Sequence, residues 1–247
     1  QFEYTPGATT DTVSFTGTMD LADATGVGPF PLVPTTLVGV SQATDIDVNI
    51  GGAGQDSLIF NGTSGDDAID VVSAGGPIGG VGFRNTVNGQ VFSFVDLRHG
   101  TSALVRGLDG DDTFNHDGAI AIPVSYEGGD PSASDVLNFT GTGAGLVTIE
   151  TDLETVTETG FSPVSYSGIE HLNVDAGTAA VDVNGSADDD AFTVQPLDAD
   201  SALVTQQGVN TVFRIDNTGD LEIDGDNGGG LENSAVVLGT EGDDVID

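Results

Sequence analysis

The chain lacks several residue types, and each absence narrows its chemistry. Its 247 residues include no cysteine, no tryptophan and no lysine. The basic residues are therefore the four arginines Arg84, Arg98, Arg106 and Arg214, together with three histidines. Without cysteine the chain can form neither a disulfide framework nor a cysteine zinc site, and it cannot use a thiol nucleophile. Long apolar runs are missing too, since none approaches the roughly 20 residues of a membrane-spanning helix. We therefore expect no membrane insertion.

Acidic residues dominate the charge. Forty Asp and Glu residues face four basic ones, which gives a formal net charge of −36. Nucleic acids and anionic membrane surfaces require a basic face, so neither is an expected partner. Self-repulsion of so many carboxylates must be relieved by high salt or by bound divalent cations, and both solutions are compatible with this composition.

The apolar residues follow a period of two. Segments 46–50, 91–97, 172–175 and 221–224 each alternate apolar and polar side chains. This alternation predicts short strands with one buried face, separated by Gly and Asp-Gly turns. It also argues against disorder, although the hydrophobic content is only 37%. Segment 146–156 can be drawn as an amphipathic helix, but a pair of strands fits its threonines better. We expect almost no helix.

The chain repeats itself at long and short range. Segment 60–69 resembles segment 183–192, and segment 11–18 resembles segment 135–142, at offsets of 123 and 124 residues. These matches predict two halves, residues 1–123 and 124–247. A shorter unit, Asp-x-apolar-x-apolar-x-Gly-Thr and its degenerate copies, starts near positions 11, 56, 101, 135, 179 and 233.

Short strands with internal repeats predict an all-β fold. The favoured architecture is a β-solenoid of the parallel β-helix or β-roll kind, in which each repeat buries its apolar face against its neighbours and both halves form one continuous solenoid. The alternative is two tandem β-sandwich domains, one in each half.

A nine-residue turn pattern recurs along the chain. Segment 51–59 matches Gly-Gly-x-Gly-x-Asp-x-apolar-x, and segments 62–70, 107–115 and 239–247 keep its first Gly, fourth Gly, sixth Asp and apolar eighth residue. Segment 185–193 has Asp188 in place of the fourth Gly, and segment 128–135 carries a two-residue insertion before Asp135. The pattern resembles the calcium-binding nonapeptide of hemolysin-type (repeats-in-toxin) proteins and covers about a quarter of the chain.

This resemblance implies Ca²⁺ bound at the turns. Calcium requires six to eight oxygen ligands, which carboxylates and the carbonyls of glycine-rich turns supply. The primary ligands implied by the resemblance are Asp56, Asp67, Asp112, Asp190 and Asp244, and the secondary ones are Asp66, Asp111, Asp189 and Asp243. The alternative interpretation is ordinary turn chemistry, in which each Asp accepts backbone hydrogen bonds.

Other constellations give little indication of catalysis. No nucleophile elbow, phosphate-binding loop or zinc motif occurs. The histidines His99, His116 and His171 lack partners at metal-ligand spacing and are interpreted as surface or turn residues. Asn61, Asn138 and Asn184 begin glycosylation sequons, but they recur at one place of the repeat, which alone accounts for them. We expect no enzyme; a β-helix enzyme acting on polysaccharides is the less favoured alternative, because four arginines would hold acidic substrates poorly.

The chain ends with the Gly-Asp-Asp turn at 242–244, which elsewhere in the chain leads into a further repeat, so the two ends together resemble an internal junction. We therefore expect either flanking repeats in a longer chain or copies that stack head to tail. The predicted function is a structural subunit or segment of an extracellular or cell-surface assembly stabilised by calcium, such as a filament, matrix or surface layer. The alternative is a calcium-dependent adhesin module that binds a glycan or a cell surface.

Overall fold

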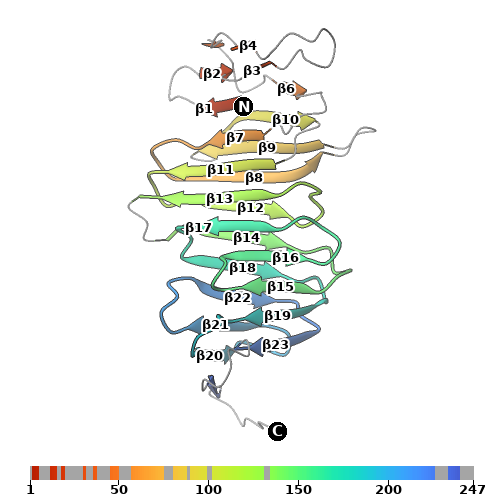
Figure 1. Cartoon of the computed structure of the whole chain (residues 1–247), viewed down its shortest axis with the longest axis vertical. Coiled ribbons are helices and arrows are strands. Elements are labelled where there is room, and N and C mark those ends of the chain that lie inside the picture. Colours follow the sequence, from red (N-terminus) through yellow and green to blue (C-terminus); the bar gives the residue numbers. More distant parts are fainter. Residues whose placement is uncertain are drawn as a thin grey trace.

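The computed structural model consists of β-strands joined by turns. It describes residues 57–74, 80–87, 90–98, 102–130, 134–225 and 233–239, and the backbone of six short strands within residues 1–50. No helix occurs among these residues, and none is therefore long or apolar enough to span a membrane. The strands lie in two eleven-stranded mixed sheets and one two-stranded sheet, and Figure 1 shows them layered along the long axis of the molecule. The all-β prediction is confirmed.

The first large sheet contains eleven strands. Its order is β23 (Asp220–Asp224), β19 (Ala180–Asn184), β15 (Val147–Glu150), β16 (Thr155–Glu158), β17 (Val164–Ser167), β13 (Val124–Gly129), β11 (Ser102–Leu108), β7 (Ser57–Asn61), β1 (Phe2–Thr5), β2 (Thr12–Phe15) and β5 (Thr36–Leu37).

The second large sheet also contains eleven strands. Its order is β24 (Ser234–Val237), β20 (Ala191–Pro196), β21 (Ala202–Gln206), β22 (Val212–Asp216), β18 (His171–Asp175), β14 (Val136–Thr140), β12 (Thr113–Asp117), β8 (Asp67–Ala74), β9 (Gly80–Val87), β10 (Gln90–Arg98) and β6 (Asp45–Asn49). The short strands β3 (Thr18–Met19) and β4 (Phe30–Pro31) form the third sheet.

The period of two places the apolar residues between the two large sheets. In β11 every second residue is buried, and neighbouring strands align the same positions, so that Phe60, Val105, Tyr126 and Tyr166 form one column of the first sheet. One buried cluster extends from Leu58 to Ile215 and draws on both sheets. Burial of each large apolar side chain contributes about 1.5–3 kcal/mol, so this cluster is the main source of stability.

The segment that could be drawn as a helix is a strand pair. β15 and β16 are antiparallel, with Ile149 opposite Val156 and both side chains fully buried. Leu153 lies in the turn between them and is 65% exposed. Alternation of buried residues therefore determines the local structure, as predicted.

The sheets are mixed because parallel and antiparallel pairings alternate. Strands from successive turns of the chain, such as β7, β11, β13 and β17, pair in parallel. Antiparallel meanders, such as β15–β16–β17, are inserted between them. Two facing mixed sheets also fit a sandwich-like arrangement.

Candidate functional site

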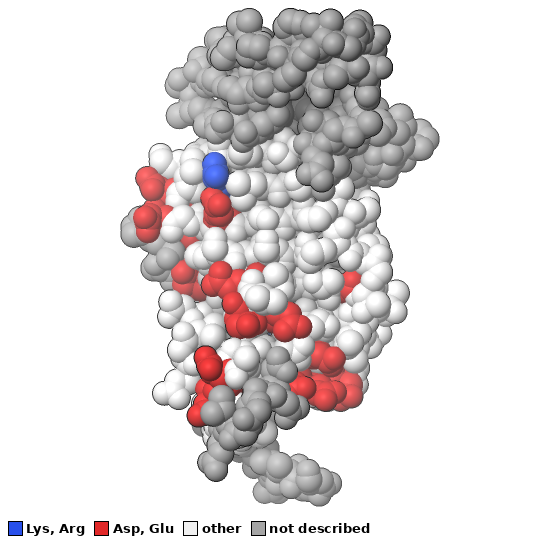
Figure 2. Space-filling view, in the orientation of Figure 1, with Lys and Arg blue, Asp and Glu red and all other residues white. Residues whose placement is uncertain are grey.

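The aspartate turns lie at one edge of the two large sheets. Strands of the first sheet continue through turns at this edge into strands of the second sheet, at β7–β8, β11–β12, β13–β14, β17–β18 and β19–β20. Parallel strands end at the same edge, so these turns are stacked. Figure 2 shows groups of acidic side chains along the length of one face, with little basic charge beside them.

The last Asp of each turn points into the protein. Asp67, Asp112, Asp135 and Asp190 are at most 5% exposed. Each lies two residues before a buried apolar residue of the following strand, such as Phe114 after Asp112, and the period of two therefore puts both on the core side. These carboxylates are the most deeply buried acidic groups of the edge.

The buried carboxylates form a ladder of backbone hydrogen bonds. The Asp67 N–H donates to Asp112 Oδ1 at 2.8 Å, the Asp112 N–H donates to Asp135 Oδ1 at 2.8 Å, and the Asp135 N–H donates to Glu170 Oε2 at 2.8 Å. Further along, the Asp190 N–H donates to Asn233 Oδ1 at 2.9 Å. Each side chain thus satisfies the backbone of the preceding layer, which is the role that ordinary turn chemistry predicts.

The first glycine of the motif leaves the space that the carboxylate occupies. A Cβ on Gly62 would stand 2.6 Å from Asp67 Oδ2 and 2.6 Å from the Gly107 carbonyl oxygen. A Cβ on Gly107 would overlap Asp112 Oδ2, and one on Gly128 would overlap Asp135 Oδ2. This position therefore requires glycine for its lack of a side chain. Positive φ occurs at other residues of the turns, such as Gly110 at 128° and Leu108 at 85°.

Two of the buried carboxylate oxygens have no hydrogen-bond partner among the described residues. These are Asp112 Oδ2 and Asp135 Oδ2. The position of a Cβ on Gly107 lies within 2.5 Å of both Asp112 Oδ2 and the Gly128 carbonyl oxygen, and that of a Cβ on Gly128 lies within 2.4 Å of both Asp135 Oδ2 and the Gly168 carbonyl oxygen. Each unpartnered carboxylate oxygen thus lies close to a second acceptor, which leaves buried negative charge uncompensated and is costly.

The electrostatics follow from this burial. Desolvation raises the pKa of Asp112 to about 7; the hydrogen bond from the Asp67 N–H lowers it, and the charges of Asp67, Asp135 and Asp66 raise it again. Burial also raises the pKa of Asp135, with Glu170 and Asp111 contributing in the same direction. A proton or a cation would relieve both groups.

The nine predicted metal ligands separate into three sets. Asp67, Asp112 and Asp190 are the buried ladder residues described above. Asp66, Asp111 and Asp189 are exposed, and Asp66 Oδ1 accepts the Asp111 N–H at 3.0 Å. Asp56, Asp243 and Asp244 lie outside the described residues.

The donor set fits a hard cation, because it consists of carboxylate and carbonyl oxygens and includes two unpartnered ones. Within the described ranges, no group of three or more His, Cys, Asp or Glu side chains is arranged to hold a metal ion. The structure thus brings the predicted residues to one edge, but the described carboxylates stack along it and do not converge.

Sequence reasoning missed three members of the ladder. Asp135 follows the two-residue insertion, Glu170 lies in a turn without the glycine motif, and Asn233 takes the position of the Asp in the last described turn. Asp135 and Glu170 share one signal, an oxygen-bearing side chain two residues before a buried apolar residue, Leu137 and Leu172.

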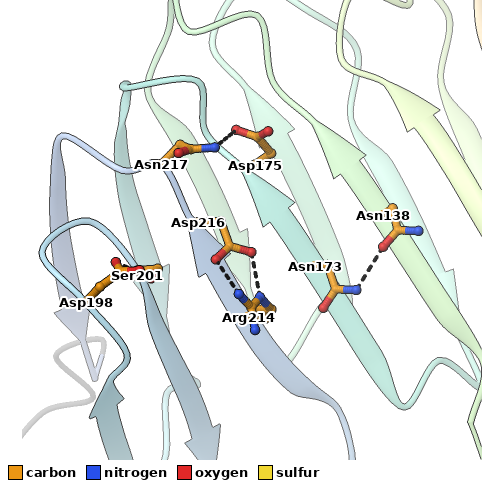
Figure 3. A network of polar contacts seen from close by, with 8 residues as sticks. All are labelled: Asn138, Asn173, Asp175, Asp198, Ser201, Arg214, Asp216 and Asn217. Atoms are coloured by element: carbon orange, nitrogen blue, oxygen red, sulfur yellow. Dashed lines mark hydrogen bonds and ion pairs between the residues drawn. The ribbon is translucent and has the colours of Figure 1, made fainter. Parts of the chain in front are cut away.

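A second polar row runs along the outer surface of the second sheet. Asn115 Nδ2 donates to Asp70 Oδ1, Asn138 Nδ2 to Asn115 Oδ1, and Asn173 Nδ2 to Asn138 Oδ1, each at 2.8 Å. Figure 3 shows the Asn138–Asn173 contact beside the ion pair of Arg214 with Asp216. The amide of the sequon residue Asn138 is therefore engaged on both sides.

The other two sequon asparagines are also in contact with the protein. Asn61 is only 5% exposed. Asn184 Nδ2 donates to Glu150 Oε1 at 2.9 Å on the neighbouring strand. The repeat places all three at strand positions, and the amides of Asn138 and Asn184 are hydrogen-bonded to neighbouring strands.

The described arginines form local ion pairs. Arg84 pairs with Asp70 at 2.6 Å and Arg106 with Glu127 at 2.7 Å, as Arg214 does with Asp216. These are partly exposed contacts of modest energy. Every arginine whose side chain the structure describes is paired in this way.

The interpretation of His116 as a surface or turn residue is wrong. His116 is 3% exposed, lies in β12, and stacks on the ring of Phe139. Its Nδ1 lies 2.8 Å from the hydroxyl of Tyr126 in the first sheet, and burial lowers its pKa to about 4. An isolated polar residue flanked by alternating apolar residues can be buried when it finds one partner, which a single sequence does not reveal. His171 is exposed, and His99 lies outside the described residues.

Comparison with known proteins adds no relative. No protein-family model, no curated protein and no solved structure matches this chain. The site is therefore interpreted from its own geometry.

Proposed function

We propose that this chain is a structural subunit or segment of an extracellular assembly, such as a filament, matrix or surface layer, that calcium stabilises. The observation that carries the proposal is the stack of buried carboxylates, in which the unpartnered oxygens of Asp112 and Asp135 lie close to backbone carbonyl oxygens. Bound calcium would neutralise charge there that no arginine reaches. We propose a structural role in preference to catalysis.

The residues that would hold calcium are those of the stacked edge. Asp112 and Asp135 offer unpartnered oxygens next to the carbonyls of Gly128 and Gly168. The exposed row of Asp66 and Asp111 offers further carboxylates at the same edge. Calcium bound there would supply positive charge, and the turns would supply hard oxygen ligands.

The proposed architecture is a β-solenoid in which the two sheets form opposite walls. Its support is the parallel, in-register pairing of equivalent strands, such as Phe60 with Val105 and Val105 with Tyr126. Such a stack offers open strand edges for association with another copy or with flanking repeats. Strand β24 is one such edge, where Val236 and Val237 are 54% and 46% exposed.

Thermal unfolding in three buffers tests the calcium proposal. The chain is unfolded with excess calcium, with chelator, and with chelator plus about 1 M NaCl, at which the screening length falls to roughly 3 Å. Specific sites predict a higher midpoint with calcium than with either other buffer, because a ligand that binds only the folded state stabilises it. Equal rescue by salt, or no difference among the buffers, would contradict the proposal.

Electron microscopy tests the assembly proposal separately. The chain at high concentration, with calcium and salt present, is expected to form elongated particles several copies long. A population of monomers under all these conditions would contradict head-to-tail stacking without affecting the calcium result.

A further inference from the structure

The chain reverses its direction of travel along the stack in four places. Each reversal is a three-stranded antiparallel meander: β1–β2–β5 and β15–β16–β17 in the first sheet, β8–β9–β10 and β20–β21–β22 in the second. In every one, the first strand lies nearer the C-terminal end of its sheet than the last strand. The chain therefore advances by two strand positions and then comes back.

Because of the reversal, tension that is applied to the C-terminal end and passes along the chain reaches an inner strand of the sheet. Among the described strands, β24 and β23 are the sheet edges at the C-terminal end, and each pairs on one side only. The next strand along the chain is β22, yet it lies fourth from that end of its sheet, between β21 and β18. A pull transmitted through residue 217 thus reaches a strand that is hydrogen-bonded on both sides.

Packing ties β22 to the two strands outside it. Phe213 and Ile215 of β22 are fully buried, as is Val204 of β21. β22 pairs with β18 over five residues and with β21 over three, and β21 pairs with β20 over five. Extraction of β22 alone would break both of its ladders and expose these side chains. Release of the whole meander first breaks the β18–β22 ladder on the inner side, after which the β20–β21 and β21–β22 ladders, separated from the core, open together.

The same arrangement holds for the first sheet and for the opposite direction of pulling. β17 lies between β13 and β16, while β15, the first strand of that meander, pairs in parallel with β19. A pull from the N-terminal side likewise arrives at a first strand, β15 or β20, that has partners on both sides. Neither end of the chain gives access to a simple sequence of edge strands.

We propose that the meanders are mechanical locks, so that the chain bears load by releasing blocks of three strands and resists strand-by-strand peeling. This rests on the proposed structural role, since a load-bearing device has a use in an assembly under tension. Without reversals, a stack of strands perpendicular to the pull would open one edge strand at a time. With them, the unit of release is a whole meander, such as residues 191–216 in the second sheet and 147–167 in the first.

The two modes differ in the length of chain that each event sets free. At about 3.6 Å per extended residue, residues 191–216 release roughly 90 Å and residues 147–167 roughly 75 Å. A single strand such as β22, with five residues, releases only about 20 Å. Optical tweezers with handles on peptide tags at the two chain ends resolve this difference.

The experiment pulls the full chain, once with calcium and once with chelator. Discrete releases of roughly 90 and 75 Å are expected for these two meanders in both buffers, alongside those of the two N-terminal meanders, because the lock depends on strand order and not on an ion. A Phe213→Leu variant, which keeps an apolar side chain on the locking strand, is expected to lower the force of the larger release without changing its length. Val236→Ala on the exposed edge strand β24 is the matched control and leaves that force unchanged.

Release of residues 191–216 in separate events of about 20–30 Å would overturn the proposal. So would an equal effect of the two substitutions. Failure of calcium to change midpoint or assembly would instead count against the proposed function alone, because the release lengths are the same in both buffers.

Discussion

Replacement of Asp112 by Asn separates the ladder role of this residue from its charge. Asn keeps an Oδ1 acceptor for the Asp67 N–H, which now donates to Asp112 at 2.8 Å. It removes the negative charge from a side chain that is 1% exposed and replaces the unpartnered Oδ2 by an NH₂ donor facing the space shared with the Gly128 carbonyl. In chelator, the substitution is therefore expected to stabilise the protein.

The magnitude follows from the pKa of Asp112. Burial raises it from 3.8 to about 7, and a difference of about three units corresponds to roughly 4 kcal/mol at neutral pH. Screening by solvent near the turn reduces this to about 2 kcal/mol. For a chain of this size, about 2 kcal/mol shifts the thermal midpoint by roughly 4–8 °C.

The pH dependence of the free energy of unfolding independently checks the sign of this stability change. Between pH 3.8 and about 7 the folded chain binds more protons at Asp112 than the unfolded chain does, so stability in chelator falls as pH rises through this window. The Asn variant lacks this contribution, and its advantage over the natural chain is expected to grow from pH 4 to pH 7. Urea unfolding at several pH values measures it.

Two comparisons complete the test. Asp111→Asn makes the same charge change at an exposed neighbouring position and is expected to alter stability by less than about 0.5 kcal/mol. With saturating calcium the Asp112 variant should respond less than the natural chain, because it has lost a proposed ligand. A variant that is less stable than the natural chain in chelator at pH 7, or a matching effect of Asp111→Asn, would refute the reasoning.

Three further substitutions probe the turns and the polar rows by urea unfolding. Gly107→Ala places a Cβ against Asp112 Oδ2 and the Gly128 carbonyl and is expected to cost about 1–3 kcal/mol, whereas Gly65→Ala meets nothing within 4 Å and should cost less than about 0.5 kcal/mol. Asn138→Ala removes two hydrogen bonds of the amide row and should cost about 1–2 kcal/mol; no loss would show that the row is not stabilising. Glu158→Gln weakens the bonds that Glu158 accepts from the Thr142 N–H at 2.7 Å and the Gly145 N–H at 3.1 Å, and should cost about 1–2 kcal/mol at pH 7. Although burial raises the pKa of Glu158, these hydrogen bonds lower it below 4.5 overall, so the loss should vanish as the pH falls into the acid range, and a loss that persists there would contradict the assignment.

Local structure could be predicted from the sequence because it depends on the period of two. The alternating segment 172–175 lies within β18, segment 221–224 lies within β23, and the threonine-rich segment 146–156 is a strand pair. The same rule, applied to the turns, places Asp112 on the side of Phe114 and hence inward. The motif resemblance directs attention to ligands, whereas the period of two alone separates the buried Asp of each turn from the exposed one.

Strand order could not be predicted, because it depends on contacts between residues far apart in the chain. Nothing in segment 191–216 indicates that its last strand pairs with β18 and its first with β24. Burial of His116 also depends on a partner in another sheet, the Tyr126 hydroxyl. Sequence patterns with a short period carry information about one strand and its faces, and not about which strand lies beside it.

Calorimetric titration of calcium into the chelator-treated chain at pH 7 tests the central claim most directly. Saturable binding to the natural chain is expected, with a loss of binding sites in an Asp112→Asn, Asp135→Asn double variant, which keeps the ladder acceptors but removes both unpartnered carboxylate oxygens. Equal binding by the two proteins would place calcium elsewhere, and absence of binding to the natural chain would contradict the claim that calcium stabilises this edge.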